Sequence, residues 1–339
     1  MHVAAKVRRT HAARAAFAAL GAAGLAWVAP VRARSVANED VLAASRKAAQ
    51  SSKDELWDAS WVEAAGEKTI ASRLAASQDS KMKLFTSWFC PFAQRAWIAL
   101  EEKGVDYSYV EINPYEVDPS LPGGYTKKQL PLEVKKDMYP DFVASSPRGL
   151  VPAVADPCGD RVWESLHVVQ YVDERFDYAP HFLPRNDPLK RAQVRIWSDF
   201  VTERMQKNFY MLLMDQDTDK QIKAKDAFFT ECRTFAQAMS RDGPYFLGKE
   251  ISMVDIALFP FWQRFLWVGG HYRGLEMPDD PEFRRLRSWW EACLERPAFA
   301  GTLVCQPRLI SSYSQYSRNE GTSDYAKNLQ SSLGSAKKP

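Results

Sequence analysis

The feature that most constrains this chain is the change of pattern around Cys90-Pro91. An apolar, strand-like run ends at Thr86, and a helical pattern follows from Phe92 to Lys103. Proline is favoured at the first position of a helix, because the N–H that it lacks has no intrahelical partner there. Cys90 is therefore expected at a helix N-terminus, where the dipole and the free N–H groups stabilise an anion. The pattern predicts a reactive thiol, with a pKa lowered from about 8.5 toward about 3.5–7.5. The alternative interpretation is a buried, inert cysteine.

The surrounding segments indicate a small α/β domain. Residues 82–86 and 107–112 have strand patterns on either side of the helix, and such a unit implies parallel strands joined by a right-handed crossover. Val151-Pro152 leads into a further strand, which we expect at a sheet edge because proline cannot donate within a sheet. Residues 161–163 form the next strand. Ser165 then suits the N-cap of a helix whose free N–H groups make a second anion site.

A long segment, residues 113–143, interrupts this pattern. It contains five prolines, two adjacent glycines and the basic pairs Lys127-Lys128 and Lys135-Lys136. We expect an irregular insertion here. A loop of this length inside a compact domain is unusual and often functional, although a solvated insertion without a site is the alternative.

Three segments taken together resemble the omega class of the cytosolic-type glutathione S-transferase superfamily. They are residues 90–95 (Cys-Pro-Phe-Ala-Gln-Arg), 146–152 (Ser-Pro-Arg-Gly-Leu-Val-Pro) and 164–165 (Glu-Ser). The resemblance extends over residues 81–320. It implies an α/β plus all-α fold, with a thioredoxin-like, glutathione-binding domain at 81–180 and an all-helical domain at 188–310.

The resemblance also implies a site. Cys90 would form a mixed disulfide with glutathione, the co-substrate, and Pro152 would follow a cis peptide bond. No metal is implied. The family usually carries a lysine near Ala144 and Ser145, for which Arg148, Lys135 or Lys136 would substitute. The residues implied to bind glutathione are Phe92, Arg148, Val151, Pro152, Glu164 and Ser165.

The second domain shows helical patterns at 188–214, 220–240 and 281–294. Ser252 and Asp255 form a capping-box-like pair at the start of another helix, and we expect Asp255 to be structural rather than catalytic. The cleft between the domains would take the acceptor substrate. Aromatic residues predicted to line it are Trp197, Tyr210 and Trp262; packing in the core is the alternative for each. Residues 311–339 form a tail with one expected helix at 313–329.

Charge and cysteine content exclude several classes of protein. Residues 1–38 hold six of the 45 Lys and Arg and no acidic residue, which leaves 39 basic and 42 acidic residues in the remainder. Such a balance does not suit a nucleic-acid binder. The five cysteines are scattered, without a C-x-x-C pair, which argues against a disulfide framework or a zinc site.

The first 80 residues are expected to lie outside the catalytic unit. Residues 1–38 have the composition of a targeting leader, most typical of an organellar (mitochondrial or plastid) transit peptide. A secretory signal, a membrane anchor and a cytoplasmic protein are the alternatives. Residues 39–80 are interpreted as a linker or N-terminal extension.

These observations predict a glutathione-dependent thiol transferase or oxidoreductase. Because position 93 is alanine, the motif has no second thiol and the mechanism should be monothiol. Deglutathionylation, dehydroascorbate reduction and small-electrophile reduction in redox metabolism or detoxification all fit. A homodimer is the assembly that we expect. The alternative from another class is a binding or scaffold protein of the same fold, membrane-associated, with little catalysis.

Overall fold

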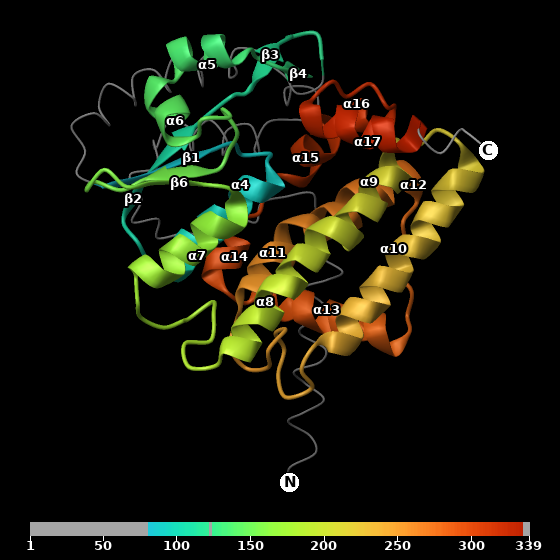
Figure 1. The fold of residues 1–339 in the computed structure, drawn as a ribbon. Helices are drawn as coiled ribbons and strands as arrows, with labels where there is room; N and C mark the ends of the chain where they lie inside the picture. The colour runs from blue at the N-terminus through green and yellow to red at the C-terminus, as the bar shows by residue number, and fades with distance from the viewer. Residues whose placement is uncertain (1–80, 122–123, 335–339) are drawn as a thin grey trace.

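The computed structural model describes residues 81–121 and 124–334 (Figure 1). The leader and linker predicted at 1–38 and 39–80 lie outside these residues. A thioredoxin-like domain with a mixed sheet is followed by an all-helical domain, as predicted. The sheet has the order β2-β1-β5-β6, formed by β1 (Met82–Thr86), β2 (Tyr107–Glu111), β5 (Ala153–Ala155) and β6 (Arg161–Trp163).

The predicted parallel pair is confirmed, and one strand position is corrected. β1 and β2 run parallel and are joined by α4 (Pro91–Glu102). β5 lies between β1 and β6, antiparallel to both, so the prediction of an edge strand is wrong. The physical reason is that Pro152 precedes the first paired residue, Ala153, and its missing N–H therefore breaks no ladder bond.

Helices cover both faces of this sheet. α4 and α7 (Ser165–Arg175) lie side by side between the sheet and the helical domain (Figure 1). α5 (Leu132–Met138) and α6 (Pro140–Ser145) lie on the opposite side, where Phe85 and Phe142 pack in a small separate core. The larger core passes from Leu84 through α4 into the second domain, so the two domains share one apolar interior.

The expectation of an irregular insertion at 113–143 is wrong. This segment contains a hairpin of β3 (Tyr115–Val117) and β4 (Tyr125–Gln129), followed by α5 and α6. Its prolines mark helix starts, because Pro131 is the N-cap of α5 and Pro140 occupies the first turn of α6.

The second domain begins with an unbroken helical run that matches the prediction for 188–214. It consists of α8 (Pro188–Phe200), a π-helical segment η1 (Val201–Gln206) and α9 (Lys207–Met214). The other elements are α10 (Thr218–Ala238), α11 (Met253–Arg264), η2 (Phe265–Gly269), α12 (Gly270–Arg273), α13 (Pro281–Leu294) and α14 (Pro297–Ala300). Ser252 and Asp255 form the predicted capping box of α11.

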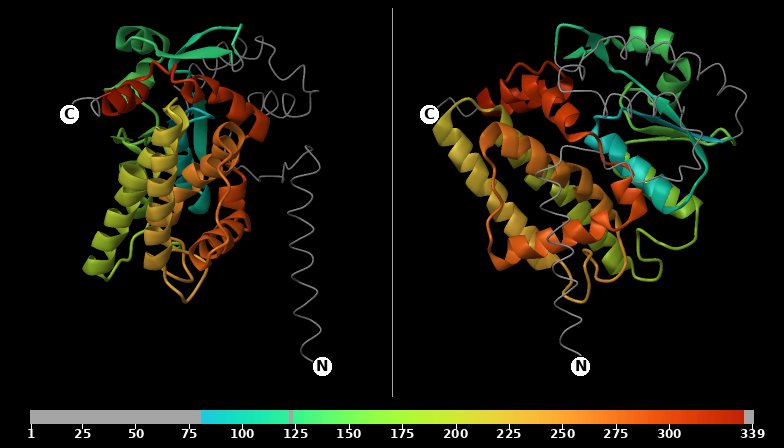
Figure 2. Two further views of the ribbon diagram at one scale, coloured as in Figure 1. Left: turned by 90° about the vertical axis from the view of Figure 1, so that its right-hand side faces the viewer. Right: turned by 180° about the vertical axis from the view of Figure 1, so that it is seen from behind.

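The tail differs from the single helix predicted at 313–329. It forms α15 (Gln306–Ser312), α16 (Ser314–Ser317) and α17 (Asp324–Gly334). These helices return to the first domain and lie beside the β3–β4 hairpin, as two views show (Figures 1 and 2). The Gln315 side chain joins them, since its Oε1 accepts from the Lys127 N–H at 3.0 Å and its Nε2 donates to the Tyr125 carbonyl at 3.3 Å.

Candidate active site

Cys90 occupies the predicted place at the start of α4. It is the N-cap residue, followed by Pro91, and its carbonyl accepts the Gln94 N–H at 3.0 Å. The predicted low pKa is wrong, because burial raises the pKa of the Cys90 thiol. The N–H groups of Ala93 and Phe92, followed by Arg264 and Lys127, act in the opposite direction but do not overcome this cost. The structure thus places Cys90 at the expected helix N-terminus, but burial of the sulfur disfavours its charged form, the thiolate.

Two buried arginines attach the Cys90 segment to the second domain. Arg264, from α11, donates to the Phe89 carbonyl and the Gln94 Oε1, each at 3.0 Å, and to the Tyr313 hydroxyl at 3.1 Å. It is entirely buried. Its hydrogen bonds fix the backbone next to Cys90 from the side of the helical domain.

Arg95 links the two predicted anion sites. Its Nη1 donates to the Ser165 hydroxyl at 3.3 Å, its Nε to the Ala257 carbonyl at 3.0 Å and its Nη2 to the Thr202 hydroxyl at 3.1 Å. Burial lowers the pKa of Arg95 to about 9, while Cys90 and then Asp199 act to raise it. The guanidinium therefore sets the position of Ser165 relative to α4.

The 146–152 segment has the geometry implied by the resemblance at Pro152. The Val151–Pro152 peptide bond is cis. Because Phe85 pairs with Ala153, the start of β5 lies next to the C-terminal end of β1. The chain continues from this end of β1 into the loop that carries Cys90. Lys135 is buried and donates from Nζ to the Gly149 carbonyl at 3.0 Å, so this lysine supports the loop from within.

Glu164 and Ser165 stand at the N-terminus of α7. Glu164 is an exposed N-cap residue with a φ of 67°. Its Oε1 pairs with the Arg148 Nη1 at 3.2 Å, and both side chains are mostly exposed. Phe92 is partly buried, edge-on to Phe261 with ring centroids 5.3 Å apart. The carboxylate, the hydroxyl and the helix N–H groups together offer partners for a ligand that carries both an amine and a carboxylate.

Comparison with known proteins adds an independent finding. Residues 89–175 match the glutathione S-transferase N-terminal domain family, and residues 201–292 match the corresponding C-terminal domain family. The chain is 30% identical to the glutathione transferase Omega 3C of Trametes versicolor, with a TM-score of 0.58, over 76% of this chain and 98% of that one. The chain belongs to the glutathione S-transferase family. A probable glutathione S-transferase, parC, of Nicotiana tabacum is 27% identical over 228 residues, which cover 67% of this chain and 91% of that protein.

A Tau-class structure shares the fold of this glutathione S-transferase. The enzyme of mango, Mangifera indica, is 23% identical with a TM-score of 0.58, over 70% of this chain and 99% of that one. This likeness concerns the fold alone. Within residues 81–121 and 124–334, no group of three or more His, Cys, Asp or Glu side chains is placed to hold a metal.

All three aromatic residues predicted to line the acceptor cleft of this glutathione S-transferase belong to the helical core or pack against it. Trp262 is buried edge-on to Trp289, and Trp197 packs against Phe200, Phe235 and Phe246. Their helical spacing places them on apolar faces. The same spacing is found for residues of the core and for residues that line a cleft, so the sequence does not distinguish the two. Tyr210 is buried under the tail, with its hydroxyl 2.9 Å from that of Tyr313.

Several residues around Cys90 were missed by the sequence interpretation. Lys127 comes from the segment that was expected to be an irregular insertion, and Arg264 comes from the buried end of α11. The tyrosines come from the tail, to which the sequence interpretation assigned no role. The Lys127-Lys128 pair and the frequent tyrosines were visible signals. Nothing local in the sequence connects them with Cys90. The tail tyrosines are Tyr313, Tyr316 and Tyr325.

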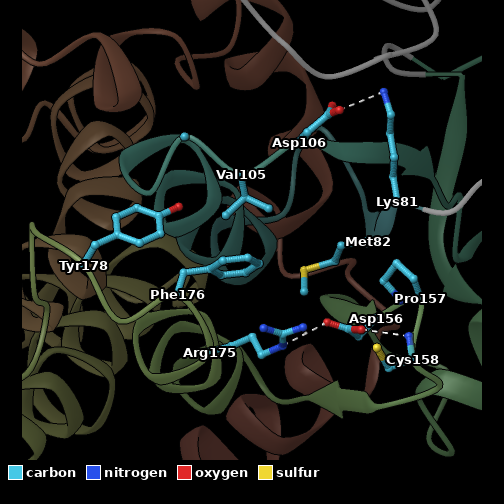
Figure 3. A pocket seen from close by; sticks show the side chains of 11 residues that line it. Lys81, Met82, Val105, Asp106, Asp156, Pro157, Cys158, Arg175, Phe176 and Tyr178 are labelled. Atoms are coloured by element: carbon cyan, nitrogen blue, oxygen red, sulfur yellow. Dashed lines mark hydrogen bonds and ion pairs between the residues drawn. The ribbon is translucent and has the colours of Figure 1, made fainter.

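A separate pocket lies at the opposite end of β1 (Figure 3). It has a volume of about 470 Å³, and its lining includes Cys158, Arg175 and Asp156. The Asp156 carboxylate accepts from the Cys158 N–H at 2.8 Å and pairs with the Arg175 guanidinium at 3.4 Å. None of the residues that line this pocket is one of those predicted to bind glutathione.

Proposed function

We propose that this chain is a glutathione-dependent thiol transferase or reductase that acts through a mixed disulfide between Cys90 and glutathione. The observation that carries the proposal is the position of Cys90, a thiol at the first turn of α4 with Arg264 and Lys127 nearby. Positive charge near the sulfur favours the thiolate, which is the species that attacks a disulfide.

The proposed reaction is a pair of disulfide exchanges. The Cys90 thiolate attacks the glutathione sulfur of a glutathionylated substrate, a Cys90–glutathione disulfide forms, and the substrate leaves as a thiolate that takes up a proton. The thiolate of a second glutathione then attacks the bound glutathione sulfur. Oxidised glutathione departs and the Cys90 thiolate is regenerated. Electrons balance, because one mixed disulfide of the substrate is consumed and one glutathione disulfide forms, while the second glutathione supplies the two electrons that release the substrate as a thiol.

The monothiol character follows from the motif. Position 93 is a buried alanine, so no second thiol lies one turn along α4 to resolve the intermediate. The Ser87 hydroxyl donates to the Ile112 carbonyl and is thus committed within the fold. The thiol of Cys90 is therefore the proposed reacting group of this segment, and external glutathione is the proposed resolving agent.

Ser165 and Glu164 are the proposed partners of the γ-glutamyl end of glutathione. The α7 N–H groups and the Ser165 hydroxyl suit its carboxylate, and the Glu164 carboxylate suits its amine. Arg148, Phe92, Val151 and Pro152 are proposed to complete the binding site. Arg148 is exposed beside Glu164, where it is available to the glycyl carboxylate.

The decisive test compares Cys90→Ser with Cys158→Ser in glutathione:hydroxyethyl disulfide exchange. Cys158 is exposed and is a control for general thiol loss. We expect Cys90→Ser to abolish exchange and Cys158→Ser to retain it. Incubation with oxidised glutathione should add one glutathione to Cys90, seen by peptide mass spectrometry. Exchange that persists in Cys90→Ser would overturn the proposal, and conjugation to a chloronitrobenzene as the main activity would indicate conventional transferase chemistry.

The competing hypothesis is a binding or scaffold protein of this fold with little catalysis. In the described part of the chain, the helices are too short or too polar to cross a bilayer. Wild-type protein that binds glutathione but shows no exchange above background would favour this hypothesis.

Localisation and assembly are separate proposals. We propose that residues 1–38 direct the protein to an organelle and that the mature protein forms a homodimer. Imaging of tagged protein with and without residues 1–38 tests the first. A mass measurement in solution tests the second.

A further inference from the structure

Lys127 occupies an aromatic cage next to Cys90. Its side chain points from β4 into the interior, and the residue is 3% exposed. The ammonium lies 4.7 Å from the ring centroid of Phe89, the residue that precedes Cys90. Three tyrosine rings complete the cage, with centroids at 5.1 Å (Tyr115), 5.0 Å (Tyr125) and 5.6 Å (Tyr316). Cation–π contacts of this kind hold a buried cation without neutralising it.

The cage supplies no anion. Among residues 81–121 and 124–334, no carboxylate pairs with the Lys127 ammonium. The titratable and charged groups that act on it are Cys90 and Arg264, and the three tyrosines stay neutral because burial raises their pKa values. An unpaired buried charge is costly. Of its neighbours, the Cys90 sulfur is the group that becomes an anion when it reacts, because the thiolate is the nucleophile.

The cage is assembled from three separate parts of the chain. Phe89 comes from the loop after β1, Lys127 and two of its tyrosines from the β3–β4 hairpin, and Tyr316 from α16. The two Gln315 hydrogen bonds hold α16 to the hairpin. The hairpin and the tail therefore place the ammonium against Phe89.

We propose that Lys127 is a positioning residue for Cys90, a caged cation that stabilises the Cys90 thiolate in the proposed thiol-transfer reaction. This inference rests on the proposed function, and it adds the hairpin and the tail to the machinery of the site. The neighbouring Lys128 has no such role, because it is exposed on the other face of β4 and pairs with Glu116 at 2.7 Å.

A titration signature follows from the burial of the ammonium. Burial lowers the pKa of Lys127 to about 7, with Cys90 acting to raise it and Arg264 to lower it. As the pH rises above this value, Lys127 loses the charge that favours the thiolate. The thiolate population should therefore rise with pH less steeply than for a single group, because the two titrations are coupled.

The test is the rate of Cys90 alkylation by iodoacetamide across pH, read by peptide mass spectrometry so that Cys90 is separated from Cys158. Lys127→Met should slow alkylation about tenfold below the Lys127 pKa of about 7, where the ammonium is charged, since one pKa unit changes the thiolate fraction by about that factor. Lys127→Arg keeps its charge across this range. This variant should restore the rate of Cys90 alkylation. A plot of the logarithm of that rate against pH should then have a slope of about one, as expected for a single titrating thiol. Lys128→Met, the matched control on the same strand, should leave the profile unchanged.

The outcomes separate this inference from the proposed function. A wild-type slope of one that equals that of Lys127→Arg would overturn the role of Lys127. Equal slowing by Lys128→Met would overturn it as well, by revealing a general charge effect. Thermal unfolding verifies each variant, and the comparison of wild type with Lys127→Arg is sufficient where Lys127→Met does not fold. The exchange test with Cys90→Ser is independent, because alkylation requires no glutathione.

Discussion

Removal of the Asp255 carboxylate should destabilise the protein strongly. Its Oδ1 accepts from the Phe246 N–H and the Trp289 Nε1–H, each at 2.8 Å, and its Oδ2 accepts from the Ser252 N–H at 2.7 Å and the Ser252 hydroxyl at 2.8 Å. In Asp255→Ala the hydroxyl can rotate to another acceptor, but three N–H groups stay buried without one. Each costs about 1–3 kcal/mol.

The net effect is smaller than the sum of these costs, because the carboxylate itself is buried unfavourably. Burial raises the pKa of Asp255, and this desolvation cost disappears in the alanine variant. We therefore expect the free energy of unfolding to fall by about 3–5 kcal/mol. α11 also carries Arg264, so loss of exchange activity should follow loss of the folded population.

Asp280→Ala is the matched control. Asp280 is the N-cap residue of α13, and it accepts from the Phe283 N–H at 3.0 Å and from Arg233 at 2.8 Å. It is partly exposed, so water can replace the lost acceptor, and the expected cost is about 1 kcal/mol. Urea unfolding followed by far-ultraviolet circular dichroism measures both variants. If Asp255→Ala costs no more than Asp280→Ala, the reasoning from buried donors is refuted.

Two further predictions concern the first domain. Burial raises the pKa of Glu111 to about 7, so the folded state keeps this proton while the unfolded chain loses it near 4.5, and stability falls as the pH rises between these values. In Glu111→Gln, the free energy of unfolding should fall by about 1–3 kcal/mol less over this pH range than in the wild type. A pH dependence of Tm equal to that of the wild type would contradict this prediction. Gly149 has a φ of 60°, and an added Cβ would lie 3.0 Å from the Cδ of Lys135, a buried side chain that is held by its hydrogen bond to the Gly149 carbonyl. Gly149→Ala should therefore cost more in urea unfolding than Gly104→Ala, which has a φ of 59° and open space, by about 1 kcal/mol or more; equal costs would show that backbone conformation alone matters.

Local sequence patterns were sufficient for much of the fold. Cys90-Pro91 marked the start of α4, and the capping pair Ser252 and Asp255 marked α11, because these signals depend on backbone geometry within a few residues. The long helix at 188–214 was found from its apolar period. The edge position assigned to β5 was wrong, since pairing on both sides is decided by strands distant in sequence.

The insertion and the tail show where local patterns fail. Prolines at 113–143 suggested an irregular loop, whereas Pro131 and Pro140 start helices, and the hairpin gains its packing from Tyr316. Short strands of three to five residues carry little periodic signal. Part of their packing comes from a segment about two hundred positions away, through the contact of Lys127 with Tyr316 and the hydrogen bonds of Gln315.

The sequence by itself determined a small α/β unit followed by helices, and it placed a thiol at a helix N-terminus, because these features depend on short-range periodicity and capping. The thioredoxin-like fold of the first domain followed from the resemblance to a known family. Only the tertiary structure decided the electrostatics of that thiol. Burial raises the pKa of Cys90, while Arg264 and Lys127 oppose this shift. Desolvation and charge proximity are properties of the packed interior, and they bring together residues that no local pattern in the chain connects.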